Sequence, residues 1–450
     1  MTALAFRAAA LRKLPGLLLI AGLIALHILL DGPLGAFREK SFDAYQQLSP
    51  RAESGNPVVL VAIDDLSLKT HGRWPWNRGK LAELVERTAE SGAAVVGIDL
   101  ILAEADTGPE GAAGDARLAR ALARVPSVVA VSLGHEITSF EAEPKAGWSI
   151  VGEVPETLPG FRGLTASLPQ FSEAAAGLGV IRSVPDGDGV LRHVPILWLR
   201  QGPDRLQLWP SFALELLRLY AGEEGYIARM AGEGFDALRI AGAIVPLEPA
   251  GTIRLWESRH DPPRVSAADL LAGRKDARLE NAVAIIELSA VGLSQFQLTP
   301  TRPARAGGDI HAAAIEQMIA GRYLEAPAMA RLFERGWFLI AALIIVGGWG
   351  ILARRLWVGT FVIALLVLAP LAYGFLAYRL DGELFDPVQP VVGIVLVAAF
   401  EGYSLYRRAE ERRNTLARQF SQYMSPSVVA QLAESDTAAM LSGEKREITI

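Results

Sequence analysis

Four apolar runs limit what this 450-residue chain can fold into more than any other feature of its sequence. The first spans residues 14–30, and the other three lie close together at 336–353, 356–377 and 387–406. Each approaches the ~20 apolar residues that a helix needs to cross a bilayer. The alternative for the first run is a cleaved signal peptide, but no small-x-small cleavage site follows it, so we interpret it as a signal anchor. We therefore expect an integral membrane protein with four transmembrane helices.

Basic residues beside these runs predict the orientation of the chain. Arginines and lysines lie in residues 1–13, at 354–355 and in 407–413, whereas the loop 379–387 carries one arginine and three acidic residues. Because short cytoplasmic segments carry the excess of basic residues, both termini should be cytoplasmic and residues 31–330 should lie outside. We expect a multi-pass protein of the bacterial inner (cell) membrane, with the lipid bilayer as its first partner.

Composition excludes several classes of site. The chain has 0 cysteines, which rules out disulfides, cysteine-ligated zinc and thiol catalysis. Its six histidines show no metal-ligand spacing, and a net charge of −5 argues against nucleic acid as a partner. No nucleophile–base pair or phosphate loop is recognisable. We therefore expect no catalytic residue, no metal site and no cofactor within this chain.

Strands alternate with helices in the segment 31–330, which predicts βαβ units and a parallel sheet. The expected strands are 57–64, 93–102, 127–133 and 282–290. The expected helices are 79–92, 115–125, 209–222, 265–273 (capped by Ser266) and 307–321. Residues 136–176 look irregular, and two further strands should flank a turn at 185–189. The expected fold class is an α/β extracytoplasmic sensory domain plus four transmembrane α-helices.

Five residues of this domain are candidates for ligand contact. Asp64, Asp65 and Asp99 end two apolar strands, and ligands of open α/β sheets bind at the carboxyl ends of strands. Trp74 and Trp76 form the aromatic part of GRWPW and offer a platform for a ligand. The alternatives are that the aspartates cap helices and loops and that the tryptophans pack a structural loop.

Two other acidic features have competing interpretations. The segment Asp186–Gly189 has a faint likeness to a calcium loop but lacks the distal glutamate, so a hairpin turn is expected there. Glu401 interrupts the last apolar run. We place it near the lipid headgroups, the alternative being a buried functional carboxylate.

The tail after the last run reads as a helical linker over residues 407–442. A heptad seam from Leu405 to Tyr423 favours a short parallel coiled coil, the alternative being a solvated helix beside the lipid phosphates. Residues 443–450, GEKREITI, read as a charged turn leading into a strand that stops as it begins. We expect that a further domain, of which 443–450 is the start, is truncated here.

Together, the motifs of the outer segment resemble the type-two CHASE sensory domain, named for cyclases and histidine kinases with associated sensory extracellular domains. The resemblance rests on motifs spread in order over residues 37–323: FDAYQQLSPR, VVLVAIDDLSL, GRWPWNRG, GAAVVGIDLILAEAD, GVIRSVPDGDGVLRHVPIL, PSFALELLRLY and DIHAAAIEQM. It implies a sensor for an unknown extracytoplasmic ligand or protein.

The tail is similar to the linker that precedes a class III adenylate/guanylate cyclase domain. The matching residues are FSQYMSPSVVAQL at 420–432 and GEKREITI at 443–450. The resemblance implies that the parent protein makes cyclic AMP from ATP as a homodimer, with Mg²⁺ or Mn²⁺ bound only in the absent catalytic domain. The alternative is a sensor or scaffold with a kinase output or no enzymatic output.

Overall fold

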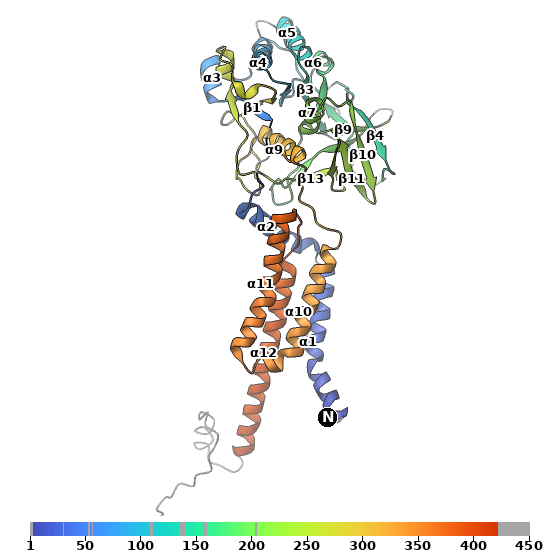
Figure 1. The fold of residues 1–450 in the computed structure, drawn as a ribbon, viewed down its shortest axis with the longest axis vertical. Coiled ribbons are helices and arrows are strands. Elements are labelled where there is room, and N and C mark those ends of the chain that lie inside the picture. Colours follow the sequence, from blue (N-terminus) through green and yellow to red (C-terminus); the bar gives the residue numbers. More distant parts are fainter. Residues whose placement is uncertain are drawn as a thin grey trace, which may run out of the picture. The chain divides into compact units, whose positions relative to one another are not determined.

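The computed structural model describes residues 3–29, 31–52, 55, 57–108, 111–134, 140–155, 160–202 and 205–421. The chain divides into two compact units, and Figure 1 gives the labels of their elements. The helical unit comprises Met1–Ser41, Pro327–Leu376 and Phe385–Ile450, whereas the α/β unit comprises Phe42–Ala326 and Ala377–Leu384. Predictions for residues 422–442 and 443–450 lie outside the described residues.

A parallel sheet forms the centre of the α/β unit, as the alternating pattern predicts. Its strand order is β14-β1-β15-β2-β3, with β6 pairing parallel and β5 antiparallel to β3. The strands are β1 (Val58–Ile63), β2 (Val95–Ile98), β3 (Ser127–Gly134), β5 (Gly163–Thr165), β6 (Gly177–Val180), β14 (Arg264–Ser266) and β15 (Val283–Leu288). The register pairs Val58 with Val283 and Ile63 with Leu288, so β15 lies between β1 and β2.

Helices cover both faces of this sheet because alternate strand residues point to opposite sides. One face packs α4 (Arg78–Glu90) and α5 (Gly111–Ala123) against a core that includes Val59, Val61, Leu84 and Leu118. The other packs α7 (Phe212–Tyr220) and α9 (Gly307–Ala320) against a core that includes Val58, Leu60, Phe212 and Ile315. A Cβ on Gly179 would lie 2.5 Å from the Phe212 Cα, so α7 packs directly on β6. Both strand faces are therefore apolar, as in other covered parallel sheets.

A second sheet adds the order β12-β11-β10-β4. Its strands are β4 (Gly147–Val151), β10 (Gly225–Ala231), β11 (Gly234–Ile240) and β12 (Ala243–Pro246). Since β4, β5 and α6 (Pro169–Ala174) all fall within residues 136–176, the prediction of an irregular segment was wrong for its described part. Elements of three to six residues are too short to show a clear period.

Two short antiparallel strand pairs complete the unit. They are β7 (His193–Pro195) with β13 (Thr252–Arg254), and β8 (Leu197–Gln201) with β9 (Leu206–Pro210). The turn at Asp186–Gly189 is confirmed, because Gly189 N–H donates to Asp186 O at 2.8 Å. The strands on either side do not pair with each other, since β6 pairs with β3 and β7 with β13. The remaining short helices are α3 (Asp65–His71), α8 (Ala267–Leu271) and the 3-10 turn Ala277–Leu279, and Ser266 caps α8 as expected.

The helical unit contains α1 (Ala3–Leu29), α10 (Ala330–Leu352), α11 (Leu356–Asp381, of which the last residues belong to the α/β unit) and α12 (Val388–Ser421). Helix α2 (Asp31–Leu48) passes from this unit into the other. The buried contacts of α1, α10, α11 and α12 include Ile20, Leu23, Phe338, Ala342, Leu366 and Ile394. Lys13 Nζ donates to Gly347 O at 2.9 Å, which ties α1 to α10.

Three helices of the part that the structure describes are long and apolar enough to cross a membrane: α10, α11 and the stretch Val388–Thr415 of α12. In α1 the apolar stretch is Lys13–Leu26, which is shorter. The fourth crossing at residues 14–30 therefore stays a prediction. Helix α12 continues through 34 residues to Ser421, so the linker predicted from residue 407 is helical in its described part. Glu401 is 8% exposed, and a Cβ on Gly16 would lie 2.5 Å from its Oε1.

Candidate functional site

A pocket of about 660 Å³ lies between two loops of the α/β unit. The first loop joins α3 to α4, and the second joins β2 to α5. Its walls include His71, Arg73, Trp76, Lys80 and Asp106. Because α4 begins and β2 ends at this loop pair, the pocket lies at the carboxyl edge of the parallel sheet, where open α/β sheets bind ligands. Its volume falls within the range of small-molecule sites.

Asp106 joins the two loops. Its carboxylate accepts hydrogen bonds from the backbone N–H groups of Arg78, at 2.8 Å, and Gly108, also at 2.8 Å. The Arg78 side chain makes two further contacts. Its Nη2 donates to Glu104 O at 3.1 Å, and its Nε lies 3.8 Å from Asp115 Oδ1. The Arg78 N–H bond is the main reason that the pKa of Asp106 is lowered. Asp106 is therefore held ionised at the start of α4, and it fixes the shape of the pocket.

The opposite wall is aromatic and cationic. Trp76 is 4% exposed, and its Nε1 donates to Gly72 O at 2.9 Å. Lys80 Nζ lies 5.4 Å from the centroid of the Trp76 ring and donates to His71 O. The Nε2 atom of His71 is buried and has no hydrogen-bond partner among the described residues. Arg73 is exposed at the same wall. The wall can therefore offer hydrogen-bond donors and positive charge to a ligand.

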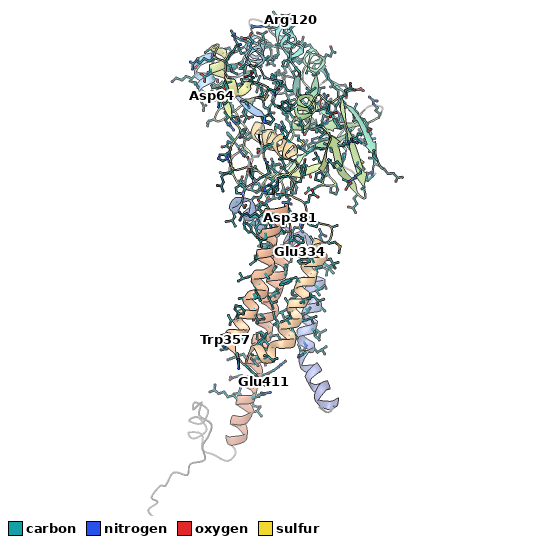
Figure 2. All side chains as sticks on the ribbon, in the orientation of Figure 1. Asp64, Arg120, Glu334, Trp357, Asp381 and Glu411 are labelled. Carbon is teal, nitrogen blue, oxygen red and sulfur yellow. The ribbon has the colours of Figure 1, made fainter. Side chains whose placement is uncertain are left out.

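Asp64 and Asp65 serve the start of α3 rather than the pocket. Asp64, labelled in Figure 2, caps α3 by accepting from Ser67 N at 2.8 Å. It also accepts from the hydroxyls of Ser67, at 2.6 Å, and Ser266, at 3.0 Å. Asp65 is exposed in the first turn of the same helix. In these contacts Asp64 acts as a cap that joins α3 to α8.

The two tryptophans of GRWPW lie beside each other with tilted rings, whose centroids are 6.2 Å apart. Trp76 lines the pocket, whereas Trp74 packs into the apolar core on the α4 face of the sheet. The Trp74–Pro75 peptide bond is cis. Because Trp76 is nearly covered by Lys80, His71 and Trp74, it supports the wall more than it offers a free aromatic face.

Asp99 lies at the end of β2 in a separate acidic cluster with Glu287. A Cβ on Gly307 would lie 2.9 Å from Asp99 Oδ2, so the first turn of α9 closes over the carboxylate. Glu287 accepts from Gly308 N at 3.1 Å and pairs with Arg264 at 3.4 Å. Burial, and then the charge of Glu287, raises the pKa of Asp99 well above its usual range. Burial raises the pKa of Glu287 to about 7. The structure thus does not bring Asp99 together with Asp64, because β15 lies between their strands.

The DGDG turn binds an arginine rather than presenting free carboxylates. Arg192, which is 1% exposed, pairs with Asp186 at 3.0 Å, with Asp188 at 2.8 Å and with Asp43 at 2.8 Å. His193 Nδ1 lies 2.9 Å from the second oxygen of Asp186. Through these contacts, the acidic residues of the turn help to join β7 to α2.

The sequence pattern did not predict five of the pocket residues: His71, Arg73, Arg78, Lys80 and Asp106. The missed signal is the pair Asn77 and Asp106. Asn77 caps α4 by accepting from Lys80 N at 2.8 Å, and Asp106 follows β2 at the next helix crossover. A helix cap and an acidic loop after adjacent crossovers meet at one edge of a parallel sheet.

No curated protein and no solved structure matches this chain. A family model of the CHASE2 domain matches residues 18–353, which includes the whole described part of the pocket-bearing sheet and also α10. The chain therefore belongs to the CHASE2 domain family, a family of extracellular sensor domains, and its role is that of a signalling receptor associated with a membrane.

Proposed function

We propose that this chain is the receptor and membrane-relay portion of a membrane-bound adenylate cyclase. It senses a signal outside the cytoplasm and controls the synthesis of cyclic AMP from ATP. The family match supports the sensing half of this proposal. The cyclase half rests on the similarity of residues 420–432 and 443–450 to a cyclase linker and first strand. Of these residues, the structure describes only 420 and 421.

The observation that carries the relay is the unbroken length of α12. It runs from Val388 to Ser421 without a break, which corresponds to about 50 Å at 1.5 Å per residue. Its first part is apolar, and from Arg407 onward it is rich in charge. A continuous helix transmits a shift or rotation at one end to the other, since its backbone hydrogen bonds keep it stiff. A membrane span that continues into the linker therefore gives a signal a direct mechanical route.

The pocket between the α3–α4 and β2–α5 loops is the proposed ligand site. Its donor wall of His71, Arg73 and Lys80 suits a small solute with acceptor groups, of which carboxylates are the simplest. Asp64, Asp65, Trp74 and Asp99 line no part of it, so Trp76 alone among the residues that the sequence suggested belongs to the proposed site, where it supports Lys80. The ligand must bind the signalling and resting arrangements with different affinity, or the output does not change.

We further propose a membrane topology and an oligomeric state. The three candidate spans and the apolar run at residues 14–30 would form four crossings of a bacterial inner membrane, with the α/β unit outside and both termini inside. The catalytic sites of class III cyclases form between subunits, so we propose a homodimer. Magnesium or manganese would bind in the catalytic domain of the parent cyclase rather than in this chain, and we propose no nucleic-acid partner.

The test uses the complete gene product in membranes of a bacterium that lacks its own cyclase. Cyclic AMP is measured while amino acids and small carboxylates are added outside. A Lys80→Met variant keeps the stem that covers Trp76 but removes the charge. We expect it to raise the half-saturating concentration about tenfold or more, because charged hydrogen bonds contribute about 1.5–3 kcal/mol.

A Lys275→Met variant is the matched control, because Lys275 is exposed and lines no part of the pocket. The same response in wild type and Lys80→Met would contradict the proposed site. Cyclic AMP that never rises above background with an intact α/β unit would contradict the cyclase output. A kinase output, the competing proposal, would then be tested by phosphate transfer from ATP in the same membranes.

A further inference from the structure

A second cavity, of about 230 Å³, lies within the helical unit. It is enclosed by one end of α10, the middle of α11 and the segment that leads into α12. The lining is almost wholly apolar and aromatic, with two carboxyl groups: Phe333, Glu334, Trp337, Ala369, Pro370, Tyr373, Phe385, Asp386 and Pro390. An acidic pair inside an apolar cavity is costly unless something satisfies it.

A hydrogen bond and aromatic ring contacts hold the cavity walls in place. Pro370 lies inside α11 and has no N–H, so the carbonyl of Leu366 loses its helical donor. The indole Nε1 of Trp337 donates to that carbonyl at 3.2 Å. Rings of Phe333, Tyr373 and Phe385 contact each other with centroids 5.0–5.8 Å apart. The cavity is therefore a built feature of three helices rather than a packing gap.

Asp386 is the polar group that the cavity leaves incomplete. It is 3% exposed, and its Oδ1 accepts from Val388 N at 2.8 Å, which caps α12. Its other oxygen, Oδ2, is buried and has no hydrogen-bond partner in the described part of the chain. Glu334, labelled in Figure 2, is 9% exposed and accepts from Asp386 N at 2.6 Å. A buried acceptor without a donor costs about 1–3 kcal/mol, and more for a charged group.

We propose that this cavity binds an ammonium-headed lipid, with the ammonium donating to Asp386 Oδ2 beside Glu334. Two neighbouring carboxyl groups favour a cation over a neutral donor. Burial raises the pKa of Asp386, and the backbone N–H groups of Val388 and Gln389 and the charge of Arg38 offset only part of this rise. Arg38 offsets the charge of both carboxyl groups and Arg331 offsets that of Glu334, but neither arginine donates to Asp386 Oδ2.

The size and the mouth of the cavity indicate a lipid rather than a free amine. Its volume equals the liquid share of about seven to eight water molecules, which fits an ethanolamine group and the first atoms of its linkage. Phe333 and Tyr373 at the rim are 49% and 43% exposed. Both lie on helices that are apolar enough to cross a membrane, so the rest of an amphiphile would continue along an apolar surface.

The test is native mass spectrometry of the full chain, purified in detergent and stripped of lipid. Phosphatidylethanolamine, phosphatidylcholine and phosphatidylglycerol with identical acyl chains are added in turn, and free ethanolamine is added as the soluble source of the same group. We expect at least tenfold preference for phosphatidylethanolamine over phosphatidylcholine, whose quaternary ammonium has no N–H to donate. Ethanolamine alone should not compete at equal concentration.

Two variants and a control locate the binding. Asp386→Asn keeps a capping side chain but removes the charge, and Ala369→Phe fills the cavity while keeping both carboxylates. Each should reduce retention of phosphatidylethanolamine about tenfold, whereas Asp381→Asn, outside the cavity, should not. If Asp386→Asn does not fold, Glu334→Gln replaces it, since the amide oxygen can still accept from Asp386 N.

Equal retention of the three lipids by the wild type would overturn the proposal. So would full retention by both Asp386→Asn and Ala369→Phe. Loss in Ala369→Phe alone would show that the cavity takes an acyl chain without its headgroup, and would also refute the ammonium contact.

Discussion

Replacing Tyr378 by phenylalanine tests how the segment between α11 and α12 is held in the α/β unit. The residues Ala377–Leu384 belong to that unit, and Leu384 N donates to Glu325 O at 2.8 Å. The Tyr378 side chain is 0% exposed. Its hydroxyl donates to Ser49 O at 2.6 Å and accepts from Trp256 Nε1 at 2.9 Å. One oxygen atom therefore joins three distant parts of the sequence.

The size of the effect follows from what the missing oxygen leaves behind. Phenylalanine keeps the ring contacts with Tyr45 at 5.6 Å and with Trp256 at 5.5 Å, so packing changes little. The indole N–H of Trp256, which is 3% exposed, loses its acceptor in a site that water does not reach. Ser49 is half-buried, so water can replace part of its bond. Leaving a buried donor unsatisfied costs about 1–3 kcal/mol, so we expect about 2 kcal/mol.

Thermal unfolding of the purified full chain in detergent, followed by tryptophan fluorescence at a fixed scan rate, measures this loss. For a unit of this size, about 2 kcal/mol lowers the midpoint by roughly 3 °C. Tyr323→Phe is the matched control. Its hydroxyl makes one long bond of 3.4 Å to Met318 O, and its loss should shift the midpoint by less than half as much.

An unchanged midpoint in Tyr378→Phe, or a larger shift in Tyr323→Phe, would refute the reasoning. The same variant also bears on the relay. Because Ala377–Leu384 directly precedes the segment into α12, loosening it should weaken the cyclic AMP response to ligand without changing the half-saturating concentration.

Three further predictions concern Glu287, Arg192 and the membrane topology. Burial raises the pKa of Glu287 from its usual 4.5 to about 7, so its folded form holds a proton that the unfolded chain releases. The resulting stability is complete below pH 4.5 and declines as pH rises through 7, by about 3 kcal/mol at most; in Glu287→Gln, denaturant unfolding at pH 5 and pH 8 should show a smaller decline. Arg192→Lys should cost about 2–3 kcal/mol in the same measurement, because lysine cannot bridge Asp43, Asp186 and Asp188 together; a loss below 1 kcal/mol would argue that the pairs contribute little. A fluorescent protein fused after Ser421 should fold in the cytoplasm and a phosphatase fused there should stay inactive, whereas an active phosphatase would reverse the topology.

The sequence predicts the parallel sheet well because its signal is local. Val58–Ile63 is a continuous apolar run, and Val283–Leu288 is apolar except for Glu287; such runs form buried strands wherever they lie in the chain. The order of strands is a different matter. The position of β15 between β1 and β2 depends on a pairing across more than 200 residues, and no periodicity records it.

That one insertion decides which candidate residues meet. With β1 and β2 adjacent, Asp64 and Asp99 would share an edge of the sheet and a single site would follow from the pattern. With β15 between them, Asp99 faces Glu287 and the first turn of α9, while Asp64 turns to Ser67 and Ser266. The pocket forms instead where α4 begins, from side chains such as Lys80 and Asp106 that look like ordinary helix and loop residues in sequence.

In the same way Asp386 looks like a solvated loop residue until Pro370, sixteen positions earlier, frees a carbonyl for Trp337 and opens the cavity around it. Sites of this kind arise from the junctions between elements, so a sequence that specifies its strands and spans clearly still leaves its binding surfaces to the topology.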